Sequence, residues 1–304
     1  MPMVTLDSLI VKAAAMKDPI VAVASAADKE ILEAVSFAIN KGLASFRLYD
    51  DEESLRRIIK QQFPSLHMNK KVSIHHVESK VEAAVSAVQA VSGGDANVLM
   101  KGNLPTPVIL KAVLNSEYGL RTEKVLSHVA AFEVPGYDRL LFVTDAAMNI
   151  EPDLETKVQI IRNAVITAHA CGVVEPIVAP LAAVETVNPL MQTTLDAASL
   201  VVMNRRGQIT GCIIDGPLAL DNAVSEKAAS QKGIVGKTAG KADILVVSNI
   251  EAGNILYKSL IYFAKAKVGA IIQGATSPIV LTSRADSAES KVYSLALAIL
   301  STKK

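Results

Sequence analysis

Short apolar runs alternate with helical repeats along most of the chain, and this alternation limits the possible folds more than any other feature. The runs are rich in β-branched residues and apolar throughout, as in strands buried on both faces. Between them apolar residues recur at i, i+3, i+4 and i+7, which indicates amphipathic helices. The order predicts parallel sheets covered by helices on both faces, an α/β fold. The predicted strands are 20–24, 44–48, 72–76, 98–100, 140–144, 177–179, 244–248, 268–272 and 279–281; the predicted helices lie near 31–39, 52–62, 81–91, 107–114, 158–168, 254–267 and 292–299.

Composition narrows the class of protein. The chain has 304 residues, half of them hydrophobic, and a net charge of +1, which is typical of a globular protein large enough for two lobes. Aromatic residues make up 4% and Trp is absent, so stacking platforms for nucleic acid are not expected. No apolar stretch approaches the roughly 20 residues of a membrane helix, and Asp7 interrupts any signal-peptide pattern. Cys171 and Cys212 lie in apolar surroundings, so we expect buried thiols in a cytoplasmic protein.

A strand-to-helix turn near the C-terminus carries the first candidate site. The run 279–281 stops at Thr282, Ser283 and Arg284, and an amphipathic helix follows. Asp286 is the expected N-cap, with Glu289 three residues later as in a capping box. A hydroxyl and a guanidinium beside a helix N-terminus can hold a phosphate or an oxyanion. The alternative is a well-capped terminal helix with a solvated arginine.

Several common motifs are absent from the sequence. Gly236-Lys237-Thr238 resembles the end of a P-loop, but Gln231 stands where that motif needs glycine. No glycine-rich dinucleotide fingerprint follows the first predicted strand, and no Gly-x-Ser-x-Gly elbow occurs. His75-His76 has no partner at metal-ligand spacing, so we expect no metal site.

Four blocks of sequence resemble the phosphate acetyl/butyryltransferase family, most closely its butyryltransferase branch. They occur in the family's order over about two thirds of the chain, which makes the combined match specific. The blocks are Lys101-Gly102-Asn103-Leu104-Pro105-Thr106 with Gly119-Leu120-Arg121 and Leu126-Ser127-His128-Val129; Thr144-Asp145-Ala146-Ala147-Met148-Asn149; residues 215–225, from Asp215-Gly216-Pro217 to Ser225; and residues 239–287, with Glu251-Ala252-Gly253-Asn254 and Ser283-Arg284-Ala285-Asp286-Ser287.

The resemblance implies an enzyme that moves a butyryl or branched short-chain acyl group between CoA and inorganic phosphate, without a metal or bound cofactor. It implies that Ser283 hydrogen-bonds the CoA sulfur and that Arg284 holds the phosphate and the carbonyl oxygen. Asp286 and Glu289 are the carboxylates near this pair. The resemblance also implies substrate-binding residues, namely Lys101, Gly102, Thr106, Lys111, Arg121, Ser127, His128, Asp145, Asn149, Asp221, Glu251, Asn254 and Gly274. Several of these, together with Gln273, follow predicted strand ends, where ligands gather in parallel sheets, and this favours one shared crevice.

Three positions depart from the family pattern. Acetyltransferases carry an aspartate, the proposed base for the thiol, seven residues after the serine, where this chain has Ser290. Lys111 replaces an expected arginine, which keeps the charge but loses the bidentate fork. Ser248-Asn249 stands where Pro-Asp is expected. The identity of the thiol base and the preferred acyl chain stay open.

The resemblance also implies a two-lobed, three-layer α/β/α fold like that of isocitrate and isopropylmalate dehydrogenases. We expect residues 1–148 with 273–304 as one domain, 149–272 as an inserted second domain, and the active-site crevice between them. A homodimer is expected, with small-molecule substrates and no nucleic-acid or membrane partner. Two other functions stay open: a CoA- or acyl-CoA-binding protein without turnover, and an NAD-dependent hydroxy-acid dehydrogenase of similar fold.

Overall fold

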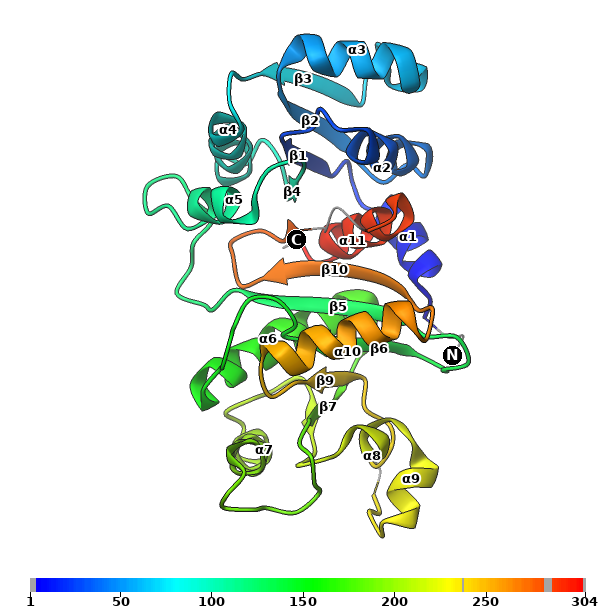
Figure 1. Ribbon diagram of the computed structural model, residues 1–304, viewed down its shortest axis with the longest axis vertical. Coiled ribbons are helices and arrows are strands. Elements are labelled where there is room, and N and C mark those ends of the chain that lie inside the picture. The colour runs from blue at the N-terminus through cyan, green and yellow to red at the C-terminus, as the bar shows by residue number, and fades with distance from the viewer. Residues whose placement is uncertain (1–3, 237, 282–285, 303–304) are drawn as a thin grey trace. The chain divides into compact units, whose positions relative to one another are not determined.

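The computed structural model describes residues 4–236, 238–281 and 286–302. It confirms a mixed α/β protein, and its contacts divide the chain into two compact units (Figure 1). The first unit comprises Leu6–Lys124 and Gly269–Lys304, and the second comprises Val125–Val268 with the residues up to Thr5. The predicted domains, residues 1–148 with 273–304 and residues 149–272, concern units that fold independently. That division stays a prediction.

Strand direction defines the sheet of the first unit. Its strand order is β3-β2-β1-β4-β11-β10, all parallel except β10, which runs antiparallel to β11. Helices cover both faces: α1, α2 and α11 lie on one side in Figure 1, and α4 and α5 on the other. The elements are α1 (Leu6–Ala14), β1 (Ile20–Ala24), α2 (Lys29–Asn40), β2 (Ser45–Asp50), α3 (Glu52–Gln62), the 3-10 turn Pro64–Leu66, β3 (Val72–His76), α4 (Lys80–Ser92), β4 (Val98–Lys101), α5 (Thr106–Val113), β10 (Lys267–Gln273), β11 (Ile279–Val280) and α11 (Ala288–Leu300).

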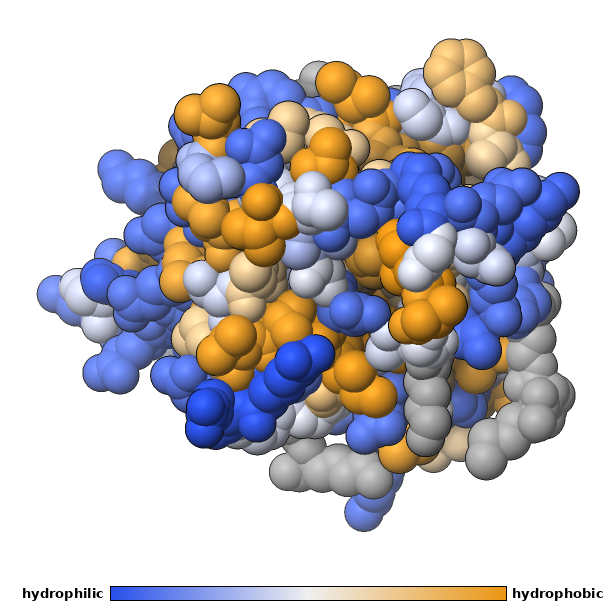
Figure 2. All heavy atoms as spheres, turned by 90° about the horizontal axis from the view of Figure 1, so that it is seen from below, coloured by the Kyte–Doolittle hydropathy of each residue, from blue (hydrophilic) through white to orange (hydrophobic). Residues whose placement is uncertain are grey.

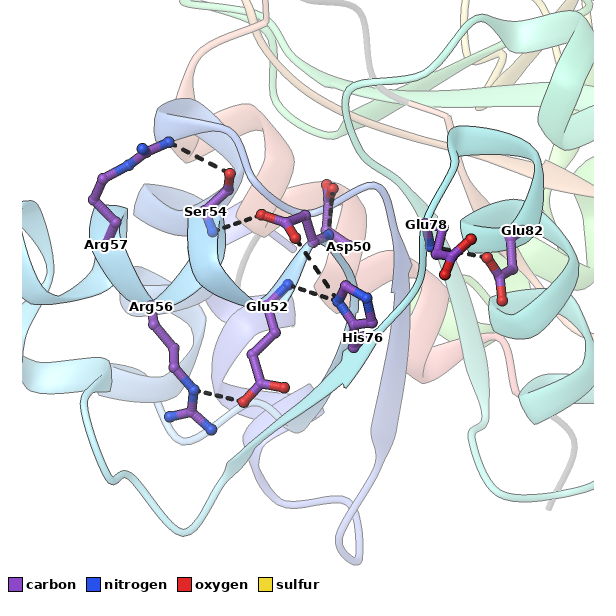
Figure 3. A network of polar contacts seen from close by, with 9 residues as sticks. Asp50, Glu52, Ser54, Arg56, Arg57, His76, Glu78 and Glu82 are labelled. Carbon is purple, nitrogen blue, oxygen red and sulfur yellow. Dashed lines mark hydrogen bonds and ion pairs between the residues drawn. The ribbon is translucent and has the colours of Figure 1, made fainter.

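Side-chain caps fix the helix starts in the first unit. Asp51 Oδ2 accepts the Ser54 N–H at 2.8 Å at the start of α3, and this backbone hydrogen bond is the main cause that lowers the pKa of the Asp51 carboxyl. His76 Nδ1, at the end of β3, accepts the Glu52 N–H at 3.2 Å (Figure 3). A helix N-terminus leaves N–H groups without intrahelical partners, and these acceptors satisfy them. The caps therefore tie α3 to the ends of the strands on both sides of it.

The second unit has a sheet of order β5-β6-β9-β7-β8. Its strands are parallel except β5, which pairs antiparallel with β6. Helix α6 packs on β5, β6 and β9, and most of its side chains are buried. The elements are β5 (Ser127–Glu133), β6 (Leu140–Thr144), α6 (Leu154–Cys171), β7 (Ile177–Pro180), α7 (Gln192–Arg205), β8 (Ile213–Ile214), α8 (Leu220–Val224), α9 (Glu226–Gln231), β9 (Ile244–Val246) and α10 (Ile250–Tyr262).

Apolar residues on the outside of the second unit are dispersed rather than gathered. Leu190 is 94% exposed and Val235 is 89% exposed. Figure 2 views the protein from the end where α7, α8 and α9 lie in Figure 1, and it shows apolar groups separated by polar side chains. In the part of the chain that the structure describes, no helix is long and apolar enough to cross a membrane. Both cysteines are buried, as predicted, and burial raises the pKa of Cys212 to about 11.

The prediction of purely parallel sheets was wrong at β5 and β10. Strand β5 was not predicted from the sequence, and it enters the sheet against β6 through pairs such as Ala130 with Val143. Strand β10 was predicted, but Ile272 pairs antiparallel with Ile279. A strand's direction in the sheet depends on the strand it pairs with and not on its local sequence. An apolar run therefore does not show whether the strand will pair parallel or antiparallel.

Two helix starts also differ from prediction. Helix α10 begins at Ile250 rather than near 254, because the Asn249 side chain caps it by accepting the Ala252 N–H. The N-cap of α11 is Ser287, whose Oγ accepts the Ser290 N–H at 3.1 Å, and not Asp286. The predicted capping box between Asp286 and Glu289 was therefore wrong.

Candidate active site

The carboxyl edge of β4 in the first unit places a buried ammonium beside a tight loop. Lys101, the last residue of β4, is 7% exposed, and its Nζ donates to the carbonyls of Gly102 and Leu104 at 3.1 Å each. These two carbonyl oxygens help to solvate the ammonium group and hold it at the start of the loop.

Gly102 has a packing reason to be glycine. A Cβ at this position would lie 2.0 Å from the Ser25 carbonyl oxygen, at the end of β1. The Gly102 N–H donates to the Ala24 carbonyl at 2.8 Å, which holds the two loops together. Thr106 and Lys111, in the first and last turns of α5, are exposed. Gly102 thus shapes the edge, whereas Thr106 and Lys111 present their side chains to solvent.

Strand register brings the end of β11 to the same edge. Strand β11 is parallel to β4, with Val280 opposite Met100. One residue further along both strands, Leu281 comes level with Lys101, about 5 Å away across the sheet. Ser283 and Arg284 lie outside the described residues. The register therefore brings Leu281, the last described residue of this segment, to the edge of the sheet where Lys101 lies.

The start of α11 is a dense polar cluster. The Glu289 carboxylate is 2.9 Å from the Tyr293 hydroxyl, and Asp7 of α1 is 3.0 Å from the same hydroxyl. Burial is the main cause that raises the pKa of Tyr293, and the two carboxylates raise it further, so this hydroxyl stays protonated. Ser290 donates its N–H to Ser287 and accepts the Ser294 hydroxyl on its carbonyl. Glu289 therefore has a structural partner as well as its predicted catalytic role.

Arg121 and Gly274 lie at the other end of the first unit's strands. Because β10 is antiparallel to β11 and β4, its last residue Gln273 is level with the start of β4. Gly274 follows it, and its carbonyl accepts the Thr122 hydroxyl at 2.5 Å. The expectation that the strand end at Gln273 shares one crevice with Lys101 was therefore wrong. Arg121, next to Thr122, is exposed.

In the second unit, the antiparallel strand β5 brings together residues from separate sequence blocks. The start of β5 lies beside the end of β6, and the Thr144 hydroxyl donates to the His128 carbonyl at 2.8 Å. Ser127 is fully buried, and the Asn163 amide of α6 donates to its hydroxyl at 2.9 Å. The His128 ring meets Tyr257 of α10 edge to face, with 5.6 Å between ring centroids. Ser127 and His128 are thus packed into the wall of this unit.

Asp145 organises the loop that follows β6. Its side chain is buried, and Oδ1 accepts the N–H groups of Ala147 and Met148 at 2.9 and 3.0 Å. Oδ2 accepts the N–H of Asn149 at 3.2 Å and its side-chain amide at 2.6 Å. The same amide of Asn149 donates to the Leu126 carbonyl just before β5. Asp145 is therefore a fully hydrogen-bonded anchor in this conformation.

The family block of α10 combines a packing residue with exposed polar ones. A Cβ on Gly253 would lie 2.7 Å from the Asp145 carbonyl oxygen and 2.9 Å from Ala146 Cα. The glycine thus lets the first turn of α10 press on the loop after β6. Glu251 and Asn254, on either side of it, are exposed. Asp221 lies apart from this group on α8, where it pairs with Lys232 at 3.3 Å and is 53% exposed.

The structure adds buried polar residues that sequence reasoning did not select. Lys291 is 1% exposed on α11, a helix in which every residue from Lys291 to Ile299 is buried. Lys157 and Asp196 form a buried ion pair of 2.6 Å beside the ends of β7 and β9, in a cavity of about 10 Å³ that has room for one water at most. They are far apart in sequence, so no local pattern links them. Among the described residues no cluster of His, Cys, Asp and Glu has the make-up of a metal site.

Comparisons with known proteins agree on one family. Residues 46–299 match the model of the family described as phosphate acetyl/butaryl transferase. The chain is 57% identical over 294 residues to a probable phosphate butyryltransferase of Bacillus subtilis, covering 97% of each chain. It is 51% identical over 280 residues to the phosphate butyryltransferase of Clostridium beijerinckii, covering 92% of each.

Solved structures give the same result. A branched-chain phosphotransacylase from Enterococcus faecalis superimposes with a TM-score of 0.82 at 36% identity, covering 93% of this chain and 98% of that one. A putative 4-hydroxythreonine-4-phosphate dehydrogenase from Salmonella typhimurium superimposes with a TM-score of 0.59 at 14% identity. The match covers 94% of this chain and 100% of that one, and it shows a shared fold alone. By family match and sequence identity together, the chain belongs to the phosphate acetyl/butaryl transferase family and is an acyltransferase.

Proposed function

We propose that the protein transfers a butyryl or branched short-chain acyl group between CoA and inorganic phosphate, so that acyl-CoA and phosphate give acyl phosphate and CoA. The observation that carries this proposal is the family match over residues 46–299. The two phosphate butyryltransferases and the branched-chain phosphotransacylase named above support the acyl class. CoA, its acyl ester and phosphate are then substrates, and the proposal includes no bound cofactor or metal.

Ser283 and Arg284 are the proposed catalytic pair. In the direction of acyl phosphate synthesis, a phosphate oxygen attacks the thioester carbonyl, and the C–S bond breaks as CoA leaves as a thiolate. Arg284 would hold the phosphate and the developing oxyanion, which needs donors placed in advance. Ser283 would donate to the leaving sulfur. The register of β11 beside β4 supports this role, because it brings Leu281, two residues before Ser283 in the sequence, level with the buried Lys101.

A carboxylate beside this pair is the proposed base for the CoA thiol in the reverse direction. An ordinary thiol has a pKa near 8–9 and needs help to become a thiolate. Ser290, where acetyltransferases carry aspartate, cannot take a proton in this way. Asp286 and Glu289 are the nearest carboxylates in sequence, and Glu289 is exposed at the start of α11. We assign the role to Glu289, with Asp286 as the alternative.

The other proposed substrate-binding residues divide by exposure. Lys111, Arg121, Thr106, Glu251, Asn254 and Asp221 present exposed side chains that could contact CoA or phosphate directly. Lys101 and Gly102 in the first unit, and Ser127, His128 and Asp145 in the second, are buried, and their proposed contribution is to shape the substrate-binding surface of their own unit; Asn149, half-buried, supports Asp145. Gly274 is buried beside Thr122, and its proposed contribution is to the end of the first unit's sheet opposite Lys101.

The decisive experiment follows thiol release from butyryl-, isobutyryl-, isovaleryl- and acetyl-CoA, with and without phosphate. We expect release that depends on phosphate and is fastest for a four- or five-carbon acyl group. Absence of phosphate-dependent release from every ester would refute the proposal. CoA binding by calorimetry without turnover would instead favour a binding protein. A nicotinamide absorbance change with hydroxy acids would favour a dehydrogenase. We also propose a two-lobed, three-layer architecture like that of isocitrate dehydrogenase, and a dehydrogenase could share this architecture.

We propose a homodimer in the cytoplasm, formed through α10. Only Gly253 is buried along this helix, while Ile255 is 67% exposed and the adjoining Phe263 is 86% exposed. We take a second copy as the occupant because the sequence resemblance implies a homodimer, and a stable dimer covers about 800 Å² per partner. Sedimentation should give a species near twice 32.2 kDa. Phe263→Glu should shift it toward the monomer, whereas Val174→Glu, on another exposed apolar residue, should not.

The proposed folding domains are residues 1–148 with 273–304, and residues 149–272. Limited proteolysis tests this division, because hinge peptides are cleaved before packed ones. First cuts near 149–153 and 274–278 would support it, and first cuts elsewhere would contradict it.

A further inference from the structure

Strand β3 is the outermost strand of the first unit's sheet, and it pairs on one side only, with β2. The Phe46 N–H of β2 donates to the Lys71 carbonyl at 2.7 Å, and the Val77 N–H donates to the Asp50 carbonyl at 3.2 Å. In a parallel pair, every second residue of a strand turns both of its backbone groups toward the neighbour. Residues 71, 73, 75 and 77 therefore face β2, and residues 72, 74 and 76 face away from it.

The backbone that faces away is open to another strand. The Val72 N–H donates to the Asn69 carbonyl at 2.9 Å within the preceding turn. Both backbone groups of Ile74, the Val72 carbonyl and the His76 N–H make no hydrogen bond among the described residues. A row of unpaired N–H and C=O groups of this kind is a template for strand addition.

An apolar groove of about 170 Å³ lies beside this free edge. Helix α3 packs on β3, and the groove is bounded by both and by the turn between them. Met68 on this turn is 84% exposed. Neighbouring strands place alternate side chains on the same face of a sheet, so every second side chain of an added strand would lie at the groove. The apolar lining is Ile59, Leu66, Met68, Val72 and Ile74, with Arg56 and His67 beside it.

Charge decides what kind of strand this edge accepts. Residues 54–77, which cover most of α3, the turn and β3, contain no Asp or Glu. Figure 3 shows Arg56 reaching Glu52, with 2.7 Å between Nε and Oε1, but exposed ion pairs of this kind are weak. The edge therefore attracts an acidic chain and repels a second copy of itself. The cations of this stretch are all exposed: Arg56, Arg57, Lys60, Lys70 and Lys71.

A nucleic acid would match these charges but not the free backbone. The N–H and C=O groups of Ile74 pair with a peptide backbone in a regular ladder, and the groove takes an aliphatic side chain. The observations therefore favour a peptide over a nucleic acid.

We propose that β3 is a docking edge for an extended acidic segment of a partner protein, which adds to the sheet as a further strand and places an apolar side chain in the groove. None of these residues belongs to the proposed catalytic site. The outcome of the test is therefore independent of the transferase reaction.

A fluorescein-labelled synthetic peptide tests the proposal on the full-length protein. The peptide spans the five residues of β3, and Val and Leu alternate with Glu in it. Fluorescence anisotropy should give a dissociation constant of about 10–100 µM, as for a short strand addition, and higher salt should weaken it. A peptide with Lys in place of Glu should not bind, and neither should one whose apolar residues are grouped at one end.

Amide hydrogen exchange locates the peptide on the unaltered protein. The peptide should slow exchange of the Ile74 and His76 N–H groups, which face away from β2. The N–H groups of Ser73 and His75 face β2 and should change little.

Two pairs of variants separate backbone pairing from charge. Ile74→Pro removes the outward N–H without breaking a bond to β2, whereas Ile74→Ala truncates the side chain and keeps the N–H. Proline should weaken binding by about 3- to 10-fold relative to alanine, the size of one hydrogen bond. Arg56→Glu should weaken it by at least about threefold. Lys227→Glu, on exposed α9, should have no effect, and circular dichroism checks the fold of each variant.

Other outcomes would overturn the proposal. Absence of peptide binding at concentrations up to about 1 mM would do so, since no weaker contact would be a specific docking site. Binding that leaves the Ile74 and His76 exchange unchanged would show that the peptide lies elsewhere. Equal binding of a short single-stranded RNA, also lost in Arg56→Glu, would indicate a general polyanion surface. Self-association that Ile74→Pro abolishes would assign the edge to a second copy instead.

Discussion

The side-chain amide of Asn149 donates to Asp145 Oδ2 at 2.6 Å, and this contact closes the loop after β6 on itself. The Asp145 carboxylate also accepts three backbone N–H groups from the same loop. Asp145, which the family resemblance predicts to bind substrate, therefore uses its carboxylate to hold this loop together. The distinction can be tested, because an anchor and a ligand respond differently to substitution.

Asp145→Ala should destabilise the fold and lower activity together. It leaves four donors without their acceptor, which should cost about 2–4 kcal/mol in the free energy of unfolding. Asn149→Ala removes only the two side-chain bonds and should cost about 1 kcal/mol. Urea unfolding measures both, beside the KM values. A large rise in KM for Asp145→Ala at unchanged stability would show direct substrate contact instead.

The ion pair between Lys157 and Asp196 should be strongly coupled. Both side chains are 8% exposed, so removal of one partner leaves a buried charge. Lys157→Met or Asp196→Leu alone should therefore cost about 3–5 kcal/mol, whereas the double variant should recover most of that loss. A double-mutant cycle by urea unfolding measures the coupling. Additive losses would mean that the two charges are solvated independently.

Arg284→Ala should lower turnover by about 10²–10³-fold, the size expected when one oxyanion partner is lost. Ser283→Ala should cost less, because it removes one hydrogen bond to a charged sulfur, worth about 1–3 kcal/mol. Steady-state thiol release gives both values, with circular dichroism as the folding control. A folded Arg284→Ala variant with full activity would exclude the proposed site.

Glu289→Gln tests the proposed thiol base. A base should be needed when free CoA accepts the acyl group, so this direction should slow by about 10²–10⁴-fold. The glutamine oxygen can still accept the Tyr293 hydroxyl, so stability should change little. Tyr293→Phe is the matched control, since it removes that hydrogen bond and leaves the carboxylate. If Glu289 serves only Tyr293, Glu289→Gln will keep its activity, and Asp286→Asn becomes the next variant to measure.

Asp243 should make stability depend on pH. Burial is the main cause that raises the pKa of this carboxyl above 3.8, although the Ile177 N–H, 2.8 Å from Oδ2, opposes the shift. Below pH 3.8 the group is protonated in the folded and unfolded states alike. As pH rises above that value, the unfolded chain loses the proton first, so this group's contribution to stability falls until the folded pKa is passed. Asp243→Asn does not titrate there.

The stability of Asp243→Asn relative to wild type should therefore increase with pH across this window and then level off. Urea midpoints measured from pH 4 to pH 7 provide the test. A difference that is constant, or that decreases with pH, would contradict the raised pKa.

The local sequence pattern was sufficient to predict most of the strands and helices and to recognise the family. The β-branched run 20–24 and the repeat that ends near Gln62 predicted β1 and α3 closely, because burial of an apolar face has a fixed period in each element. The four motif blocks indicated the acyltransferase family without any structural information. Chemistry that depends on residue type and order can be recognised along a sequence.

Only the tertiary structure decided which segments meet. The directions of β5 and β10, the pairing of Lys157 with Asp196 and the burial of Lys291 all depend on partners distant in sequence. The antiparallel turn of β10 separates Gly274 from Lys101, whereas the antiparallel entry of β5 brings His128 beside Thr144. Periodicity specifies which face of a segment is buried. Long-range hydrogen bonds and packing determine which other segment covers that face.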